Sequence, residues 1–341
     1  MIEQVVTDQT GEKFNQRSMR SRFMAPGLVL ALIGGIALLW IPVPSHTILL
    51  KAFYDFCHFP LFGGVAILLL YLARQLGESR GWSVGRQYGT AFIGAVTLGV
   101  LTEGVQSFSS SRFAEWSDLW RDVSGAVAAL GFSVTYDPRF TGRVATWRLA
   151  PRKHMVHAGV GLLVVIALSP VAVWTYAYGD RATRFPSLVQ FSSEWEMMFL
   201  KGRDCAVQIV PPPSGWKKSQ VDTVGHMVCY PAHYPGIRLE EPYPDWRGYS
   251  HFGVEVYSEL PVARSLNIRI NDAHHTHEYA DRFNQAVIIS PGLNHIHILL
   301  DDIRHAPLGR ELDLGAIRNV MLFAIGPKEE FSLYVDNIRL E

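Results

Sequence analysis

The chain has 341 residues, 31 basic and 31 acidic side chains, and 48% hydrophobic residues. A chain of this length allows two or more domains. The zero net charge argues against nucleic acid as a partner, because nucleic-acid-binding domains carry a basic surface. The average hides two different halves: long apolar runs dominate residues 24–178, whereas charged residues are scattered through residues 179–341.

Five stretches in the first half have the length of membrane-spanning helices, about 17–25 residues. The first has a long charged leader and is followed by no small-x-small cleavage site, so we interpret it as a retained anchor. The last ends in aromatic residues typical of a membrane interface, Trp174, Tyr176 and Tyr178. The five predicted helices cover about residues 24–41, 55–73, 88–108, 116–136 and 155–178.

Basic residues predict the orientation of these helices. They cluster in the tail before the first helix, between the second and third, and between the fourth and fifth, but hardly at all in the other loops. Since basic loops stay in the cytoplasm, we expect a multi-pass protein of the bacterial inner membrane. Its tail (1–23) and basic loop (137–154) are then cytoplasmic. The domain after the fifth helix (179–341) is periplasmic or extracellular.

The second half changes to the period of β-strands. In Leu266-Asn267-Ile268-Arg269-Ile270, apolar and polar residues alternate, and turn residues separate this run from its neighbours. Several such runs predict an all-β sandwich of jelly-roll type. Cys205 and Cys229 lie in this half, but spacing alone does not decide whether they form a disulfide. The expected strands are about residues 205–210, 237–240, 252–257, 265–270, 286–289, 295–300, 320–325 and 331–340.

Polar residues interrupt the apolar helices in one expected leaflet. Asp55 and His58 share a helix face, as do Glu103 and Gln106, and Asp118 and Asp122 flank Arg121. Ionisable groups near hydrocarbon are costly, so this group is a candidate catalytic or binding pocket facing outward. Alternatively, carboxylates paired with Arg112 and Arg121 lock helix ends that approach closely at Gly104 and Gly125. The catalytic candidates are Asp55, His58, Glu103, Gln106, Arg112, Asp118 and Asp122.

These residues resemble a known family. Asp55-x-x-His58-Phe59, together with the series from Glu103 to Gly125, is similar to the VanZ-like membrane proteins over residues 24–136. The chain departs from that pattern at Phe56, where the family usually has lysine, and at Asp122, where it usually has asparagine. The resemblance implies a four-helix membrane domain, a cell-envelope role and a connection with glycopeptide resistance. It implies no defined reaction.

The second half also has a resemblance. Its closing run, Tyr334 to Leu340, is similar to the last strand of galactose-binding-like sandwiches found in carbohydrate-binding modules. The segment 271–284 joins two expected strands and is dense in aromatic and polar side chains, as sugar-binding loops are. We expect no metal and no cofactor there. The candidate ligand-binding residues are Asp272, His274, His275, His277, Tyr279, Asp281, Arg282, Asn284, Trp246 and Arg247.

Two functions remain open at this stage. The first is an accessory envelope protein that binds a glycan through the outer domain, with the lipid bilayer and an envelope glycan or lipid-linked precursor as partners. The second is a membrane-embedded enzyme acting on a lipid-linked envelope glycan through the Asp55, His58, Glu103 and arginine group.

Overall fold

The computed structural model divides into two compact units, a helical unit over Met1–Trp174 and a strand-rich unit over Thr175–Glu341. The finer division into a tail, a membrane domain, a basic loop and an outer domain stays a prediction. The described residues are 30, 33–34, 47–106, 116–141, 150–217, 222–243 and 245–341.

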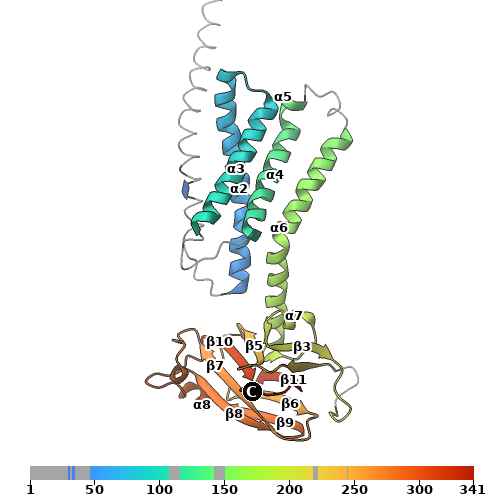
Figure 1. Ribbon diagram of the computed structural model, residues 1–341, viewed down its shortest axis with the longest axis vertical. Coiled ribbons are helices and arrows are strands. Elements are labelled where there is room, and N and C mark those ends of the chain that lie inside the picture. Colours follow the sequence, from blue (N-terminus) through green and yellow to red (C-terminus); the bar gives the residue numbers. More distant parts are fainter. Residues whose placement is uncertain are drawn as a thin grey trace, which may run out of the picture. The chain divides into compact units, whose positions relative to one another are not determined.

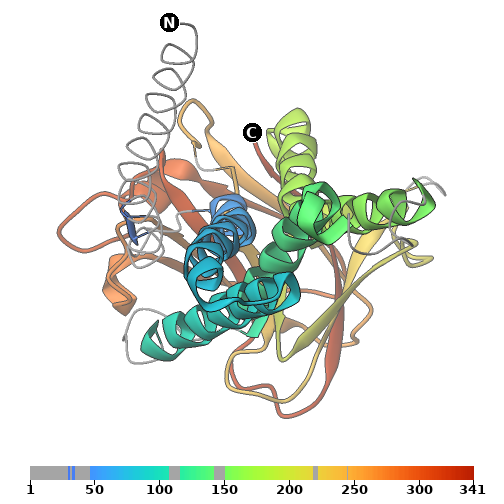
Figure 2. The ribbon, with the colours of Figure 1, turned by 90° about the horizontal axis from the view of Figure 1, so that it is seen from above.

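Among the described residues, the helical unit contains four long helices, α2, α3, α4 and α6, and one short helix, α5 (Figure 1). Residues from α2, α3 and α4, including Phe62, Ala91 and Ala126, form a common buried core. In the view from above, these three helices are neighbours (Figure 2). The bounds are α2 (Ile48–Arg80), α3 (Val84–Gln106), α4 (Trp116–Tyr136), α5 (Pro138–Thr141) and α6 (Ala150–Arg184), the last of which continues into the second unit.

Helix α2 begins seven residues before the expected start at Asp55. Thr47 caps it, since its hydroxyl accepts a hydrogen bond from the backbone N–H of Leu50 at 3.1 Å. The helix ends at Gly81, whose φ of 63° is the left-handed conformation that glycine adopts without strain. The cap at Thr47 therefore starts the helix one turn or more before the expected position.

Helices α2 and α4 approach each other closely at Gly125. The sequence suggested close approach at two glycines, Gly104 and Gly125, and the structure shows it at the second. A Cβ on Gly125 would overlap the backbone oxygen of Phe59, so only glycine fits there. A Cβ on Gly104 would meet no atom within 4 Å, so this residue does not serve the same purpose.

Three described helices are long and apolar enough to cross a membrane: residues Ile48–Arg80, Val84–Val105 and Arg152–Arg184. The most apolar part of the third has no buried residue, which suits a helix surrounded by lipid. Helix α4 does not meet the same criterion, and most of the first expected helix lies outside the described residues. The predicted number of five membrane helices is therefore not confirmed, and the orientation in the membrane stays a prediction.

The strands of the second unit form two antiparallel sheets, as expected for a sandwich (Figure 1). The sheet that we call sheet A has the order β3-β4-β11-β6-β9, with β1 also paired to β11, and sheet B has the order β2-β5-β10-β7-β8. The jelly-roll type stays a prediction. The strands are β1 (Ser187–Val189), β2 (Leu200–Arg203), β3 (Cys205–Val210), β4 (Val224–Cys229), β5 (Gly236–Glu240), β6 (His251–Ser258), β7 (Arg264–Asp272), β8 (Phe283–Ile289), β9 (Gly292–Leu299), β10 (Ile317–Phe323) and β11 (Phe331–Leu340).

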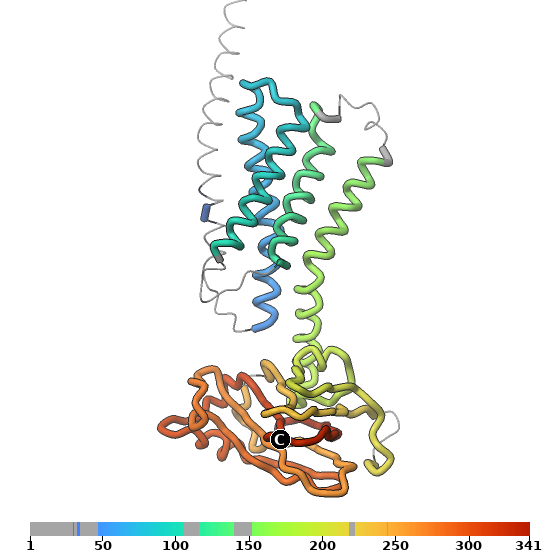
Figure 3. The backbone as a smooth tube through the Cα atoms, in the orientation of Figure 1, coloured from blue at the N-terminus to red at the C-terminus, as the bar shows by residue number. Residues whose placement is uncertain are grey.

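Alternation along each strand separates the core from the surface. Leu266, Ile268 and Ile270 of β7 are buried, while Asn267 and Arg269 between them are partly exposed, so the predicted period is confirmed. The last strand, β11, lies between β4 and β6 in sheet A, and Figure 3 traces the chain to this strand in red. The short strands β1, β2 and β4 lacked a clear apolar alternation and were not expected.

Cys205 and Cys229 form a disulfide between β3 and β4. The two residues are directly opposite in the antiparallel pair, and their Cα atoms are 4.1 Å apart. The bond links two neighbouring strands of sheet A that follow each other in the chain. The sequence alone did not decide whether these two cysteines pair, and the structure shows that they do.

The end of α6 packs on the strands within the second unit. Arg181 bonds the backbone oxygen of Glu241 and lies over the ring of Phe199. Arg184 joins Glu196 at 2.7 Å and Asp180 at 3.0 Å. The short helices α7 (Glu194–Met197), η2 (Tyr279–Asp281) and α8 (Leu300–Arg304) complete the unit.

Candidate functional site

The membrane-half candidates converge on a buried triad of side chains from three helices. His58 of α2, Glu103 of α3 and Asp122 of α4 are at most 8% exposed. Nδ1 of His58 lies 2.9 Å from Oδ1 of Asp122. One potential ligand atom from each residue falls within 4.8 Å of the other two. Residues that are 19 to 64 positions apart in the sequence therefore meet in one place.

A second layer of charge lies beside this triad. Arg121 forms ion pairs with Asp118 and, at 3.7 Å, with Asp55. Arg112 lies outside the described residues, and the side chain of Gln106 is likewise not described. The structure thus brings together five of the seven catalytic candidates, and Arg121 lies between two of them, Asp55 and Asp118.

Chemically, the triad has the groups needed for proton transfer. A histidine oriented by a carboxylate is a general base or acid when a substrate reaches it. The same residue types bind divalent metals, so these three side chains are also the group in the described part of the chain that could hold a metal ion. The buried Oδ2 of Asp122 has no hydrogen-bond partner among the described residues.

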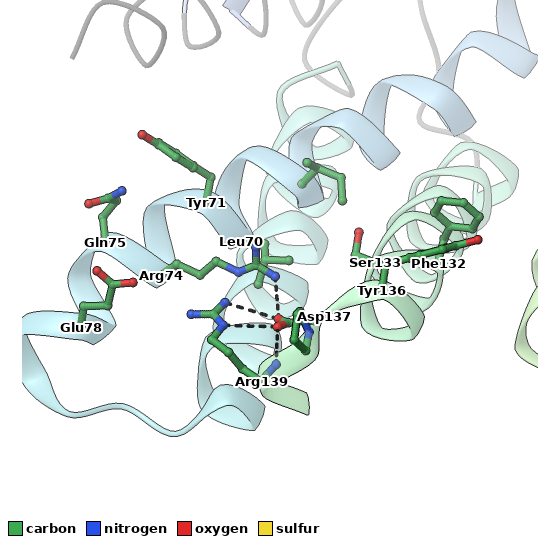
Figure 4. Close-up of a pocket in the computed structure, with 12 residues that line it drawn as sticks. Leu70, Tyr71, Arg74, Gln75, Glu78, Phe132, Ser133, Tyr136, Asp137 and Arg139 are labelled. Atoms are coloured by element: carbon green, nitrogen blue, oxygen red, sulfur yellow. Dashed lines mark hydrogen bonds and ion pairs between the residues drawn. The ribbon is translucent and has the colours of Figure 1, made fainter. Parts of the chain in front are cut away.

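A different polar group lies at the other end of α2. Asp137 accepts hydrogen bonds from Arg74 at 2.8 Å and from Tyr88 at 3.2 Å, and it pairs with Arg139 at 3.3 Å. Arg74, Asp137 and Arg139 border a cavity of about 820 Å³ beside α2 and α4 (Figure 4). Asp137 accepts hydrogen bonds from side chains of three helices. We therefore interpret this group as a structural contact that holds α2, α3 and the start of α5 together.

In the second unit, the predicted ligand loop 271–284 is held by an arginine that the sequence did not single out. Arg310 binds both oxygens of Asp272, at 2.6 and 2.9 Å, and also pairs with Asp281. Asp281 additionally accepts hydrogen bonds from the backbone and hydroxyl of Thr276 at 2.7 and 2.9 Å. The two aspartates are therefore occupied in holding the loop.

The other candidates from this region divide between core and surface. Trp246 is fully buried and stacks on Phe252, so its ring has no face open to a sugar. Arg247 is exposed and paired with Asp245, whose pKa it lowers to about 2 through hydrogen bonds.

The histidine candidates lie near carboxylate and carbonyl oxygens. The side chain of His274 is exposed, and its Nε2 lies 3.8 Å from Oδ2 of Asp313. His275 contacts the backbone oxygen of Asp281 at 3.0 Å and the ring of His277. Within the described residues, these histidines do not form a group that could hold a metal ion.

The remaining three candidates join a surface that we call the basic face. Asn284 accepts a hydrogen bond from Arg269 and donates one to the backbone of Tyr279, each at 3.3 Å. Arg282 lies over the ring of Tyr279, 5.4 Å from its centroid. The basic face is the outward side of sheet B with its adjoining loops: Lys201, Arg203, Arg238, Asn267, Arg269, Met321, Phe323, Asn284, Tyr234, Tyr279 and Arg282.

Strand register places these residues in two rows. In the first, Lys201 is opposite Arg238, which is opposite Met321, which is opposite Arg269. In the second, Arg203 and Phe323 are both opposite Gly236. A Cβ on Gly236 would collide with the backbone of Leu322 and Phe323, so only glycine allows this close pairing of β5 with β10.

Aromatic rings form the floor and borders of the basic face. The guanidinium of Arg269 lies 5.0 Å from the centroid of Phe323, and Tyr234 meets the same ring edge-on at 6.0 Å. Tyr234 and Tyr279 are 45% and 70% exposed, so both rings are open to a ligand. Sequence reasoning found Tyr279 and Arg282 from the composition of their loop. It missed the other basic residues because they come from three separate strands.

Comparisons with known proteins give a weak structural similarity to carbohydrate-active proteins. No protein-family model and no curated protein sequence matches the chain. A family 11 carbohydrate-binding module from Clostridium thermocellum, solved with a β-1,3-1,4-mixed-linked tetrasaccharide, is 14% identical, with a TM-score of 0.33 over 42% of this chain and 88% of that one. The CBM22-2 xylan-binding domain of Paenibacillus barcinonensis Xyn10C is 15% identical, with a TM-score of 0.30 over 45% of this chain and 96% of that domain.

An exo-β-agarase is 11% identical with a TM-score of 0.37, over 46% of this chain and 25% of the enzyme. The chain thus spans a quarter of that enzyme. TM-scores below 0.5 do not define a common fold, so the sandwich rests on its own strand pairing. Since no family model matches, the resemblance to VanZ-like proteins stays a prediction.

Proposed function

We propose that this protein is anchored in a bacterial cytoplasmic membrane and binds a cell-envelope glycan through the basic face. In this proposal it is an accessory protein of envelope polysaccharide or peptidoglycan processes, or of glycopeptide resistance. The observation that carries the proposal is the combination, on one sheet face, of exposed rings with planar polar groups from Asn284, Arg269 and Arg282. Sugars are held by such pairs of apolar ring faces and directed hydrogen bonds.

The disulfide supports the proposed location of the sandwich. Disulfides persist in oxidising compartments outside the bacterial cytoplasm and are rare inside it. The Cys205–Cys229 bond therefore agrees with the orientation inferred from the basic loops. The most apolar part of α6 has no buried residue, which supports a membrane anchor directly before the sandwich.

The direct test is binding by the full-length chain in phosphatidylcholine nanodiscs, titrated calorimetrically with neutral and acidic envelope polysaccharides and peptidoglycan fragments. We expect at least one to bind, and Tyr279→Ala to weaken it about tenfold, since a stacking ring contributes roughly 1–2 kcal/mol. Tyr230→Ala is the matched control, because Tyr230 is also exposed but follows β4 of the opposite sheet. No binding to any member of the panel would contradict the proposal.

The buried triad favours a second candidate, an enzyme acting on a lipid-linked envelope glycan. His58 would be the general acid or base, oriented by Asp122, with Glu103 as the second carboxylate and Arg121 beside them. We would measure turnover of lipid-linked glycan precursors by the protein in vesicles. His58→Ala and Glu103→Gln should abolish it, whereas Glu78→Gln, at an exposed position of α2, should not. Turnover that survives both triad substitutions would exclude this chemistry.

A further inference from the structure

We propose that the glycan bound by the basic face is an acidic polysaccharide, one whose sugar residues carry carboxylate or sulfate groups. This inference rests on the proposed glycan-binding function and names the class of glycan. The anionic groups would pair with Arg269 of β7 and Arg282 just before β8 on one side of the face, and with Lys201 and Arg203 of β2 on the other.

The first argument is the number of positive charges without a carboxylate partner. Arg238 pairs with Glu240. In the described part of the chain, no carboxylate pairs with Lys201, Arg203, Arg269 or Arg282, although most arginines elsewhere in this unit have one. Arg269 instead contacts the neutral amide of Asn284 and the sulfur of Met321. The face therefore has four cations whose charge is not neutralised by the protein.

The second argument is that these cations are close enough to affect one another. Burial lowers the pKa of Arg269, and the positive charges of Arg282 and Arg203 lower it further. The buried Nε of Arg282 also has no hydrogen-bond partner among the described residues. Repulsion between these like charges raises the free energy of the unbound protein. An anionic ligand relieves the repulsion and adds attractive ion pairs.

The third argument concerns the type of anion. Guanidinium groups hold carboxylate and sulfate oxygens through two parallel hydrogen bonds, which a neutral hydroxyl does not match. Between the arginines lies the apolar floor of Met321 and Phe323, with the exposed ring of Tyr279 beside it. A chain of charged sugar rings uses both features, whereas the headgroup of an anionic phospholipid offers charge but no ring face to stack on Tyr279.

The experiment compares two matched pairs of polysaccharides on the full-length protein in phosphatidylcholine nanodiscs: polygalacturonate with its methyl ester, and dextran sulfate with dextran. Each pair has one backbone and differs in charge. We expect at least tenfold tighter binding of the charged member, and about a tenfold loss for Arg269→Gln and for Arg282→Gln. Arg339→Gln should bind normally, because Arg339 lies on β11 in the opposite sheet. Raised salt should weaken binding of the charged member.

The possible results separate this inference from the proposed function. Equal binding of charged and neutral members would overturn the inference and leave glycan binding intact. If none of the four polysaccharides binds but peptidoglycan fragments do, the inference also fails and the proposed function stands. Binding to phosphatidylglycerol vesicles in preference to all glycans would overturn both. Unchanged affinity in both arginine variants would remove the assignment to this face.

Discussion

The guanidinium of Arg269 lies over the ring of Phe323, 5.0 Å from its centroid, although the two residues come from different strands. Arg269 of β7 pairs with Met321 of β10, and Phe323 lies two residues further along β10 on the same face. Gly236 on β5 has no side chain that would collide with the backbone of β10 beside Phe323. A cation over an aromatic face is stabilised by the ring's quadrupole. Since Nε of Arg269 also donates to Asn284, the ring and the amide together hold the guanidinium in place.

This arrangement predicts that charge alone is not sufficient at position 269. Arg269→Lys keeps the positive charge but loses the planar group that stacks on Phe323 and bonds Asn284. We expect the variant to bind an acidic polysaccharide about three- to fivefold more weakly than the wild type, a loss smaller than that of Arg269→Gln. Titration calorimetry of the three proteins measures the order. A lysine variant that binds as well as the wild type would show that the planar group has no role.

A second prediction concerns acid stability of the sandwich. Burial raises the pKa of Asp272, but hydrogen bonds from Arg310 and from the backbone of Asp313 outweigh it, so the pKa lies below its usual value. Hydrogen bonds from Arg310 and Thr276 also lower the pKa of Asp281. Carboxyls whose pKa is lowered by folding stabilise the folded state above their unfolded pKa, about 3.9, and lose this contribution as the pH falls through the folded values.

Arg310→Gln should therefore lower the free energy of unfolding by about 2–3 kcal/mol at pH 7, because it leaves the buried Asp272 charge without its partner. The difference between wild type and variant should shrink as the pH is lowered below about 4. Thermal unfolding of the sandwich, followed by circular dichroism between pH 7 and pH 3, tests both statements. A difference that stays constant over this range would rule out the ionised aspartates as its source.

The disulfide gives a third prediction. Removing both cysteines by Cys205→Ala and Cys229→Ala should lower the free energy of unfolding by about 3 kcal/mol, since the bond closes a loop with a sequence separation of 24. The same pair tests the location. In intact cells with the natural orientation, both thiols should resist alkylation until a reductant is added. Cysteines that react without reductant would place the sandwich in a reducing compartment and contradict the proposed orientation.

The sequence predicted the division between helices and strands well, because periodicity and length are local properties. The strands 205–210 and 331–340 and the helix 116–136 agree with β3, β11 and α4 residue for residue. It also placed Asp55, His58, Glu103, Asp118 and Asp122 in one group, since the topology puts them at one end of their helices. Local pattern did not reveal the basic face, because that surface exists only after β2, β5, β7 and β10 pair.

Two sequence interpretations fail for identifiable reasons. Trp246 lies in a polar-aromatic run typical of ligand loops, yet its ring is buried and its Nε1 donates to the backbone of Tyr243 at 2.7 Å. Aromatic residues in a loop are therefore not distinguishable from core residues by composition. Gly104 was expected to be a packing glycine, but a Cβ there would meet no atom of the described residues within 4 Å, because the neighbours that decide which helix face packs are not specified by a single sequence.

The last prediction tests the packing that holds the buried triad. At Gly125, a Cβ would overlap the backbone oxygen of Phe59, one residue after His58, and backbone atoms do not move aside as side chains do. Gly125→Ala should thus separate α2 from α4 and pull Asp122 away from His58, destabilising the bundle by several kcal/mol, on the order of an overpacked core. Gly89→Ala is the matched control, since a Cβ there meets no atom within 4 Å and replacing helical glycine by alanine is intrinsically favourable. Thermal unfolding and yield of folded protein in detergent should fall for Gly125→Ala alone. An alanine at 125 that leaves both unchanged would mean that α2 and α4 do not make this contact in the membrane.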